Sequence, residues 1–264
     1  DADIRKCFDT ISHKWLLENT PMESKILESW LKSGFMKGGK LFNTESGTPQ
    51  GGIISPTLSN HTLNGMQQVL KKAFPRKQVG NSVSRTSYSS SINLIRYADD
   101  FIVTGRSKRQ LERVKKVLSE FLLPRGLELH PDKTQIVHIN KGFNFLGWTF
   151  VKGRNGYLQR LISKDAQQTH KAKLRDLVKN SGNQPPSALI ANLNPVIRGW
   201  CNYHRCCSGI WSIWSKTNQY LYRLLWKWAC KRHTRRSRLW IYDKYWKYVD
   251  KRRTFVAPSE KDLI

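Results

Sequence analysis

The chain has 264 residues, of which 39% are apolar, and 46 Lys and Arg against 19 Asp and Glu give it a formal net charge of +27. The apolar fraction excludes a disordered chain, and the length suits one large domain or two smaller ones. So large an excess of positive charge makes a polyanion the expected partner. Residues 151–264 hold 24 basic and 6 acidic side chains (+18) and residues 1–150 hold 22 and 13 (+9), so the second part is the stronger candidate for binding phosphates.

The sequence disfavours a membrane or secreted protein. No apolar run approaches the roughly 18 residues of a spanning helix, and the N-terminus lacks a signal-peptide pattern. The five cysteines form no CxxC pair, so they are expected to be reduced, structural and intracellular. They are Cys7, Cys201, Cys206, Cys207 and Cys230. The chain opens at Asp1 inside an expected strand, which predicts that further sequence precedes it.

The first elements predict a strand, helices and a hairpin. Residues 1–9 are expected to form a strand with an acidic cluster. The apolar spacing of residues 13–32 suits helix, with Pro21 marking a break or a new start. Residues 34–47, which contain Gly-Gly and alternating side chains, predict a β-hairpin or a loop with short strands.

A glycine-rich loop and a helix follow. Residues 47–54 form the loop, Ser55 is the expected N-cap and Pro56 the first helical position of a helix that continues to about Leu70. Backbone amides at this helix N-terminus would approach a nucleotide closely. Residues 77–91 are rich in serine and predict a loop.

The centre of the chain predicts a hairpin that carries two adjacent acids. Asp99 and Asp100 lie between the two short apolar runs of residues 94–104. Because burying an unpaired carboxylate is costly, the pair is expected at the exposed turn. With Asp3 from the opening strand, three carboxylates would form an oxygen-rich site for Mg²⁺. An Asp-Asp pair alone is usually a solvated turn, but the apolar arms and the acidic opening strand favour the metal site.

A helix and further strands complete this part. Ser107 is expected to cap a helix whose apolar stripe ends near Pro124 and Gly126. Residues 135–139 continue as a strand, and residues 143–150 form a strand or a tight hairpin. The order of elements predicts an α+β fold, an antiparallel sheet with helices on one face.

Past about residue 155 the pattern becomes helical. A boundary between Gly153 and Ser163 divides the chain into domains 1–155 and 156–264. The second holds seven of the ten tryptophans, interleaved with Arg and Lys. This composition favours nucleic acid, because guanidinium groups meet phosphates while aromatic faces stack on unpaired bases. Several of these tryptophans must still be core residues. Helices are expected over 165–179, 186–203 and 215–231, with a linker at 181–186.

Tyr97-Ala-Asp-Asp100 between apolar strands resembles the central motif of reverse transcriptases, and the flanking segments resemble the other motifs of that family in their order. Arg-Gly-Trp-x-Asn-Tyr within residues 192–205 is similar to the maturase domain (thumb or X) of group II intron-encoded proteins. The resemblance covers nearly the whole chain. The other matching segments are Asp3 with Phe8, Thr48–Pro56, Gly126–Thr134, Phe145–Trp148 (similar to the primer grip), Lys244–Trp246 and Thr254–Ala257.

The resemblance implies an RNA-directed DNA polymerase and maturase, which binds its intron RNA to promote splicing and copies RNA into DNA during retrohoming. The implied fold is an α+β reverse-transcriptase palm followed by an all-α thumb or maturase domain. The implied partners are group II intron RNA, an RNA template with a DNA primer, and dNTP, with two Mg²⁺ ions as cofactor. The expected location is the bacterial cytoplasm or an organelle.

The matched positions assign the chemistry. Asp3, Asp99 and Asp100 become catalytic metal ligands, with the backbone carbonyl of Ile4 as a further ligand. Phe8 falls at the sugar-discriminating position, where a ring under the sugar excludes a 2′-hydroxyl; its alternative is a core phenylalanine.

The nucleotide and primer contacts follow in the same way. Gln50 and Gly51 would lie against the incoming nucleotide and the templating base. Tyr97 is likewise expected to bind the substrate. Leu146 and Gly147 would form the primer grip. Lys133 would neutralise or protonate the leaving pyrophosphate, or be a solvated turn lysine. Asp9 is expected to be structural, because neighbouring positions on a strand point in opposite directions.

The predicted RNA-binding residues lie in the second part of the chain, although an Arg/Lys run alone is usually a solvated face. They are Arg198, Arg232, Arg235, Arg236 and Arg238. Tyr203 is expected to contribute to the fold of its motif or to the RNA surface. The sequence from Asp1 to Ile264 holds no segment that resembles the family's fingers region or an HNH-like nuclease. Together with the +18 charge of the second part, this leaves as the alternative a splicing cofactor that binds RNA without polymerising, with a two-metal nuclease as a distant third.

Overall fold

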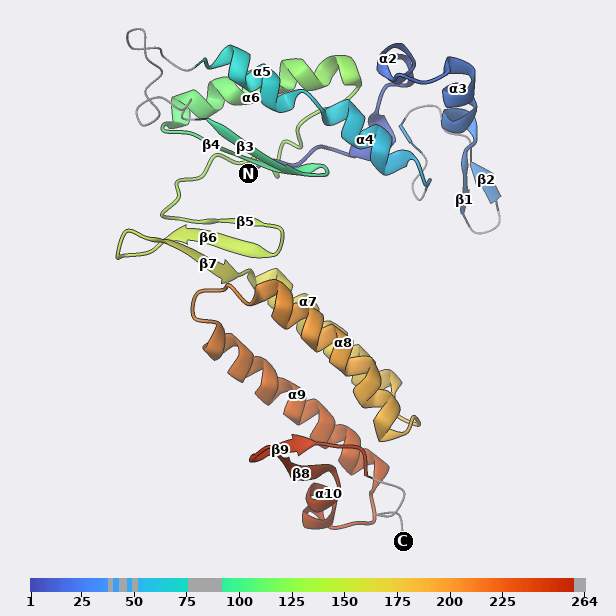
Figure 1. Ribbon diagram of the computed structural model, residues 1–264, viewed down its shortest axis with the longest axis vertical. Helices are drawn as coiled ribbons and strands as arrows, with labels where there is room; N and C mark the ends of the chain where they lie inside the picture. Colours follow the sequence, from blue (N-terminus) through green and yellow to red (C-terminus); the bar gives the residue numbers. More distant parts are fainter. Residues whose placement is uncertain (38–39, 43–46, 49–51, 76–91, 259–264) are drawn as a thin grey trace. The chain divides into compact units, whose positions relative to one another are not determined.

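A computed structural model describes residues 1–37, 40–42, 47–48, 52–75 and 92–258 (Figure 1). The chain forms two compact units, Asp1–His138 and Ile139–Ile264. The domain boundary expected between Gly153 and Ser163 falls inside the second unit. A strand at residues 148–152, before that boundary, pairs with a strand at residues 158–162, which lies within it.

The first unit contains two antiparallel hairpins and six α-helices among its described residues. Both hairpins were predicted, and the break at Pro21 is confirmed, because one helix ends at Asn19 and the next begins at Ser24. The elements are α1 (Cys7–Thr10), α2 (His13–Asn19), α3 (Ser24–Lys32), β1 (Phe35–Lys37), β2 (Lys40–Phe42), α4 (Ser55–Leu63), α5 (Met66–Ala73), β3 (Asn93–Tyr97), β4 (Asp100–Thr104), α6 (Lys108–Leu122) and the 3₁₀ turn η1 (Leu123–Arg125).

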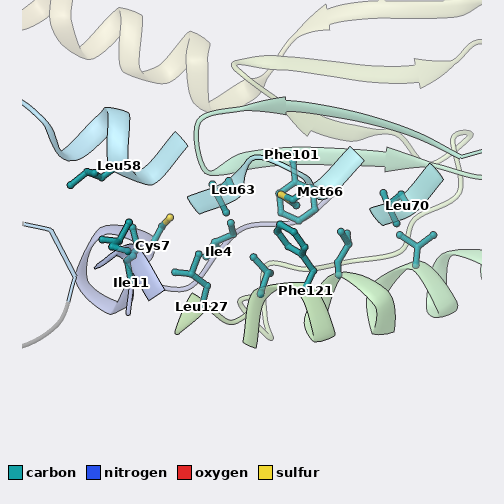
Figure 2. Packing of buried hydrophobic residues seen from close by; sticks show 14 of the residues in the cluster. Ile4, Cys7, Ile11, Leu58, Leu63, Met66, Leu70, Phe101, Phe121 and Leu127 are labelled. Atoms are coloured by element: carbon teal, nitrogen blue, oxygen red, sulfur yellow. The ribbon is translucent and has the colours of Figure 1, made fainter. Parts of the chain in front are cut away.

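Helices α5 and α6 lie along one face of the β3–β4 hairpin (Figure 1). The predicted cap of α6 is confirmed, since the Ser107 hydroxyl accepts a hydrogen bond from the Gln110 N–H at 3.2 Å. Figure 2 shows the core between sheet and helices, where Ile4, Phe101 and Phe121 gather. Phe101 and Ile4 are almost completely buried, so both the hairpin and the opening segment are anchored to this core.

Four local predictions are wrong. The helix expected from Ser55 to Leu70 is two helices, because Gly65 has φ +100° between α4 and α5, outside the helical range. Ser55 is the first residue of α4, which Ile54 precedes as the cap. The opening strand is reduced to two isolated bridges followed by α1. Residues 135–139 form no strand.

The second unit joins a three-stranded antiparallel sheet to a helical bundle. The three long helices confirm the predicted helical region, whereas β7, α10 and the β8–β9 hairpin were missed. The elements are β5 (Phe143–Phe145), β6 (Trp148–Lys152), β7 (Leu158–Ile162), α7 (Lys164–Asn180), α8 (Pro186–His204), α9 (Ile210–Arg232), α10 (Arg238–Tyr245), β8 (Trp246–Val249) and β9 (Arg252–Phe255).

Aromatic residues close the core of this bundle. Trp228 and Trp246 are buried with Tyr245 among leucines of α7, α8 and α9. The Trp228 indole N–H donates to the Ser181 carbonyl at 2.9 Å, so its polar edge is satisfied. These tryptophans are core residues, as predicted. All five cysteines are free. Among the described residues, no helix has the length and apolarity needed to cross a membrane.

Candidate active site

The opening segment lies between β4 and the chain that follows α6. Ala2 pairs with Phe101 on one side and Ile4 pairs with Leu129 on the other, both antiparallel. The Ala2 N–H donates to the Phe101 carbonyl at 3.0 Å, and the Asp3 carbonyl accepts from a backbone N–H of the neighbouring segment at 2.8 Å. These bonds join parts of the chain about a hundred residues apart and fix the backbone of Asp3.

Alternation along these strands places two acids on one face. Ala2 and Ile4 pack into the core, so Asp3 between them faces the opposite, outer side. Asp100 immediately precedes the buried Phe101 and by the same alternation also faces outward. The sheet therefore presents the Asp3 and Asp100 carboxylates on a common outer face; their joint binding of a cation with Asp99 stays a prediction.

Asp99 lies in the tight turn of the hairpin. Tyr97 pairs with Asp100, which leaves Ala98 and Asp99 as the two turn residues. Ala98 has φ +54°, in the left-handed region that a residue with a Cβ seldom adopts. Ala98 and Asp100 are exposed and Asp99 is half-buried, and the position of the turn is held by Arg96.

The Arg96 guanidinium joins the turn to helix α4 and its end. It donates to the Ala98 carbonyl at 2.9 Å, to Asn60 Oδ1 at 3.0 Å and to Asn64 Oδ1 at 3.1 Å. Burial lowers the pKa of Arg96. Sequence reasoning missed this residue. The available signal was its position two residues after Leu94, which puts a charged side chain on the core-facing side of an apolar strand, where it needs partners.

Asp100 and Lys133 respond electrostatically to the neighbouring charges. The pKa of Asp100 is raised, first by burial and then by the negative charges of Asp99 and Asp3. Lys133 Nζ donates to Asp3 Oδ2 at 2.7 Å. This hydrogen bond, together with the charge of Asp3, raises the pKa of Lys133. The segments around Asp3, Asp99 and Lys133 thus meet in one electrostatic cluster.

The donor chemistry of this cluster suits a divalent cation. Carboxylate oxygens are the ligands that Mg²⁺ prefers, and Asp99 and Asp3 are close enough to Asp100 for their negative charges to raise its pKa. Within the part of the chain that the structure describes, no three His, Cys, Asp or Glu side chains converge as a metal-binding group. Lys133 neutralises Asp3 in this arrangement. Ile4 directs its side chain into the core, and ligation by its carbonyl stays a prediction.

The residues expected to contact the nucleotide are partly described. Phe8 is half-buried on α1, and its carbonyl accepts from the Thr48 N–H at 2.6 Å. Gly47 has φ +78°, and a Cβ there would collide with the Phe8 carbonyl, so only glycine allows this approach. Gln50 and Gly51 lie outside the described residues.

Tyr97 and Asp9 lie in different surroundings in the first unit. Tyr97 is 67% exposed on β3, directly opposite Asp100. Asp9 lies on helix α1, so the strand alternation that was used to set it aside does not apply. It remains a residue without an assigned role in the chemistry.

The predicted primer-grip residues form the turn between β5 and β6 in the second unit. Phe145 pairs with Trp148, and both residues between them have positive φ, +49° for Leu146 and +78° for Gly147. Two successive positive φ values are typical of a type I′ hairpin turn. The Gly147 carbonyl accepts from the Ser163 N–H at 3.0 Å, next to the start of α7.

The predicted RNA-binding arginines differ in their surroundings. Arg198 on α8 is exposed, as are Arg235 and Arg238 near the end of the chain. Arg232 donates to the carbonyls of Gln184 at 2.7 Å and Gly182 at 3.4 Å, and its guanidinium lies 5.3 Å from the Trp228 ring centre. Arg236 lies 5.0 Å from the ring of Trp240. Arg232 therefore stabilises the loop that follows α7 by binding two of its carbonyls.

Two family models match the chain. The model described as reverse transcriptase (RNA-dependent DNA polymerase) matches residues 1–150, and the model described as group II intron, maturase-specific domain matches residues 167–246. Both agree with the motifs identified from the sequence.

Individual relatives match much of the chain, and some of them are named as intron-encoded proteins. Protein YkfC of Escherichia coli is 30% identical over 196 residues, 64% of this chain and 51% of that protein. The group II intron-encoded protein LtrA of Lactococcus lactis is 27% identical over 214 residues, 61% of this chain and 36% of LtrA. A COX1/OXI3 intron 2 protein of Saccharomyces cerevisiae is 28% identical over 251 residues, 76% and 29% of the two chains. The chain thus spans about half or less of the length of these relatives.

Proposed function

This chain belongs to the reverse transcriptases and maturases encoded by group II introns, and on that premise we propose that it carries the catalytic centre for RNA-directed DNA synthesis and part of the surface that binds intron RNA. The observation that supports this most strongly is the common outer face of Asp3 and Asp100 beside the Asp99 turn. The proposed setting is the bacterial cytoplasm or an organelle.

The acidic face is proposed to bind two Mg²⁺ ions through Asp3, Asp99, Asp100 and the Ile4 carbonyl. When bound, such a pair of ions stabilises the attacking and leaving oxygens of nucleotidyl transfer. The chain's own contribution is a set of carboxylates on backbone that neighbouring strands and Arg96 hold in place, with Lys133 as the adjacent cation.

Lys133 is proposed to serve the leaving group. A lysine ammonium is protonated at neutral pH, and a protonated amine beside the reacting phosphates is able to neutralise or protonate the leaving pyrophosphate. For this, Lys133 must leave Asp3 when the nucleotide arrives, and its 63% exposed side chain has the freedom to do so.

The substrate contacts complete the proposal. Phe8, Tyr97, Gln50 and Gly51 are proposed to bind the dNTP and the templating base. The Leu146–Gly147 turn is proposed to hold the primer paired with its RNA template.

The second unit is proposed to bind group II intron RNA and so promote splicing. Its basic surface, represented by Arg198, Arg235, Arg236 and Arg238, supplies phosphate contacts. The alternative of a splicing cofactor that does not polymerise rested on the absence of a fingers region. A chain that covers only part of its relatives' length gives that alternative no support.

The decisive experiment replaces Asp99 with Asn in the complete gene product. We expect Asp99→Asn to abolish Mg²⁺-dependent primer extension on an RNA template while binding of the intron RNA persists. Glu112→Gln is the matched control, because it removes one negative charge from an exposed position on α6. Unchanged primer extension by Asp99→Asn would reject the proposed catalytic centre.

A further inference from the structure

A side chain of the maturase motif holds the turn between β5 and β6. Tyr203, the last residue of Arg-Gly-Trp-x-Asn-Tyr, donates its phenolic hydrogen to the Leu146 carbonyl at 2.8 Å. The two residues are 57 positions apart but lie in the same compact unit. The contact thus connects a motif on helix α8 directly to the residue expected to touch the primer.

The turn needs such support because of its residue type. Leu146 has φ +49°, although the first position of a type I′ turn strongly favours Asn, Asp or Gly. Both turn carbonyls are held from outside the hairpin, Leu146 by Tyr203 and Gly147 by the Ser163 N–H. The surrounding structure, rather than the local sequence, therefore fixes this conformation.

Stacked rings fix α8 against the sheet at the same place. His204 lies edge-on to Trp148 with ring centres 4.8 Å apart, and to Trp200 at 5.1 Å. Trp200 in turn stacks on His170 of α7 at 4.3 Å with the planes 6° apart. This cluster orients Tyr203 toward the turn. The Leu146–Gly147 turn, α7 and α8 line a largely apolar cleft of about 880 Å³.

We infer that Tyr203 is a positioning residue for primer binding, acting through the Leu146 carbonyl. The maturase motif would then serve DNA synthesis as well as the fold of the RNA-binding unit. This inference rests on the proposed function, since it takes the turn to contact the primer. The bond is accessible to water, because Tyr203 is 55% exposed, and its loss is therefore expected to have a modest effect.

The first test removes only the hydroxyl, in the complete gene product. Tyr203→Phe should raise both the Kd for a primer–template duplex, measured by fluorescence anisotropy, and the KM for that duplex by about two- to fivefold. The kcat and the KM for dNTP should stay unchanged. Tyr157→Phe, the same change at an exposed position between β6 and β7, is the matched control and should leave all four constants unchanged.

A second substitution distinguishes positioning from general damage. Leu146→Asn creates Asn-Gly, the pair that favours the type I′ turn by itself. In this background Tyr203→Phe should change the Kd by less than about twofold, because the turn no longer needs the bond. Additive effects of the two substitutions would overturn the inference.

Hydrogen exchange tests whether the Tyr203–Leu146 hydrogen bond stabilises the turn, without any enzymatic step. Tyr203→Phe should speed exchange of the amides in residues 145–149 by about two- to fivefold, while Tyr157→Phe leaves them unchanged. Unchanged exchange overturns the inference. Faster exchange with an unchanged primer–template Kd overturns the link to the primer. If Tyr203→Phe shows both effects, but the wild-type protein binds primer–template and never extends a primer, only the proposed function is contradicted.

Discussion

Lys133 Nζ and Asp3 Oδ2 form an ion pair of 2.7 Å between the opening segment and the segment that follows α6. The lysine thus occupies an oxygen that the proposed Mg²⁺ site would use. Mg²⁺ and the ammonium must compete for Asp3, so the charge of Lys133 is expected to weaken Mg²⁺ binding in the absence of substrate.

Lys133→Met should therefore bind Mg²⁺ more tightly, by a few-fold, while extending primers more slowly. Binding is measured with Mn²⁺ as a paramagnetic substitute, and extension at saturating Mg²⁺. Lys108→Met on the exposed face of α6 is the control. Weaker metal binding by Lys133→Met would show that the two cations do not compete.

The raised pKa of Asp100 predicts a pH-dependent cost to the fold. Since burial and the neighbouring acids disfavour its charged form, the folded protein binds this proton more tightly than the unfolded chain. The cost is present at neutral pH and disappears as the pH falls through the raised pKa toward the ordinary Asp value of 3.8.

Asp100→Asn should accordingly raise the free energy of unfolding at pH 7 and give no gain near pH 3.5. The gain should be well below the ~1.4 kcal/mol of a tenfold change in proton affinity, because the side chain is largely solvated. Urea unfolding at several pH values measures it. A gain independent of pH would exclude relief of the unfavourable charge as its cause.

Arg96 is predicted to support catalysis by holding the acidic turn. Arg96→Lys retains the charge but lacks the fork that reaches Asn60, Asn64 and the Ala98 carbonyl together. We expect a stability loss of about 1–3 kcal/mol and at least a tenfold lower kcat. Arg109→Lys on α6 provides the comparison. A wild-type kcat in Arg96→Lys would mean that the turn holds its shape without the guanidinium.

Two glycines should respond in opposite directions to alanine. Gly65 has φ +100° and a Cβ there would touch the Phe121 ring at 3.4 Å, so Gly65→Ala should destabilise the protein by about 1–2 kcal/mol. Gly199 is helical with no atom within 4 Å of an added Cβ, so Gly199→Ala should stabilise it by about 0.5–1 kcal/mol. Thermal unfolding measures both, and equal effects would contradict the assigned conformations.

The arginines at the end of α9 and just after it are predicted to have two different roles. Arg235, Arg236 and Arg238 should bind RNA, whereas Arg232 should stabilise the fold. Neutralising Arg235, Arg236 and Arg238 should flatten the slope of log affinity against log salt for intron RNA by up to about 0.7–0.9 for each phosphate that is no longer neutralised. Arg232→Gln should instead lower stability, because its partners are the carbonyls of Gly182 and Gln184. An unchanged slope in the triple variant would count against RNA binding there.

Local signals were sufficient for the elements that local chemistry decides. Ser107 and the stripe of α6, the break at Pro21 and the Asp99–Asp100 hairpin all follow from patterns within a few residues. The break at Gly65 was missed although its residue was visible, because the apolar spacing continues on both sides of it.

Long-range contacts were beyond such patterns. Nothing near Ala2 indicates that it pairs with Phe101, and nothing near Arg96 names Asn60 and Asn64 as partners. The motif order did suggest that Asp3 and Asp100 meet, but the support for their backbones comes from pairings that only the folded chain reveals.

Tryptophan side chains of the second unit differ in exposure, so their fluorescence can report on different parts of the unit. Trp211 is 77% exposed at the start of α9, whereas Trp228 is 5% exposed further along the same helix. A soluble quencher will therefore reach Trp211 and spare Trp228. An RNA that covers the beginning of α9 will protect Trp211 from the quencher. Unfolding of the helical bundle will expose Trp228 to water and shift its emission to longer wavelength.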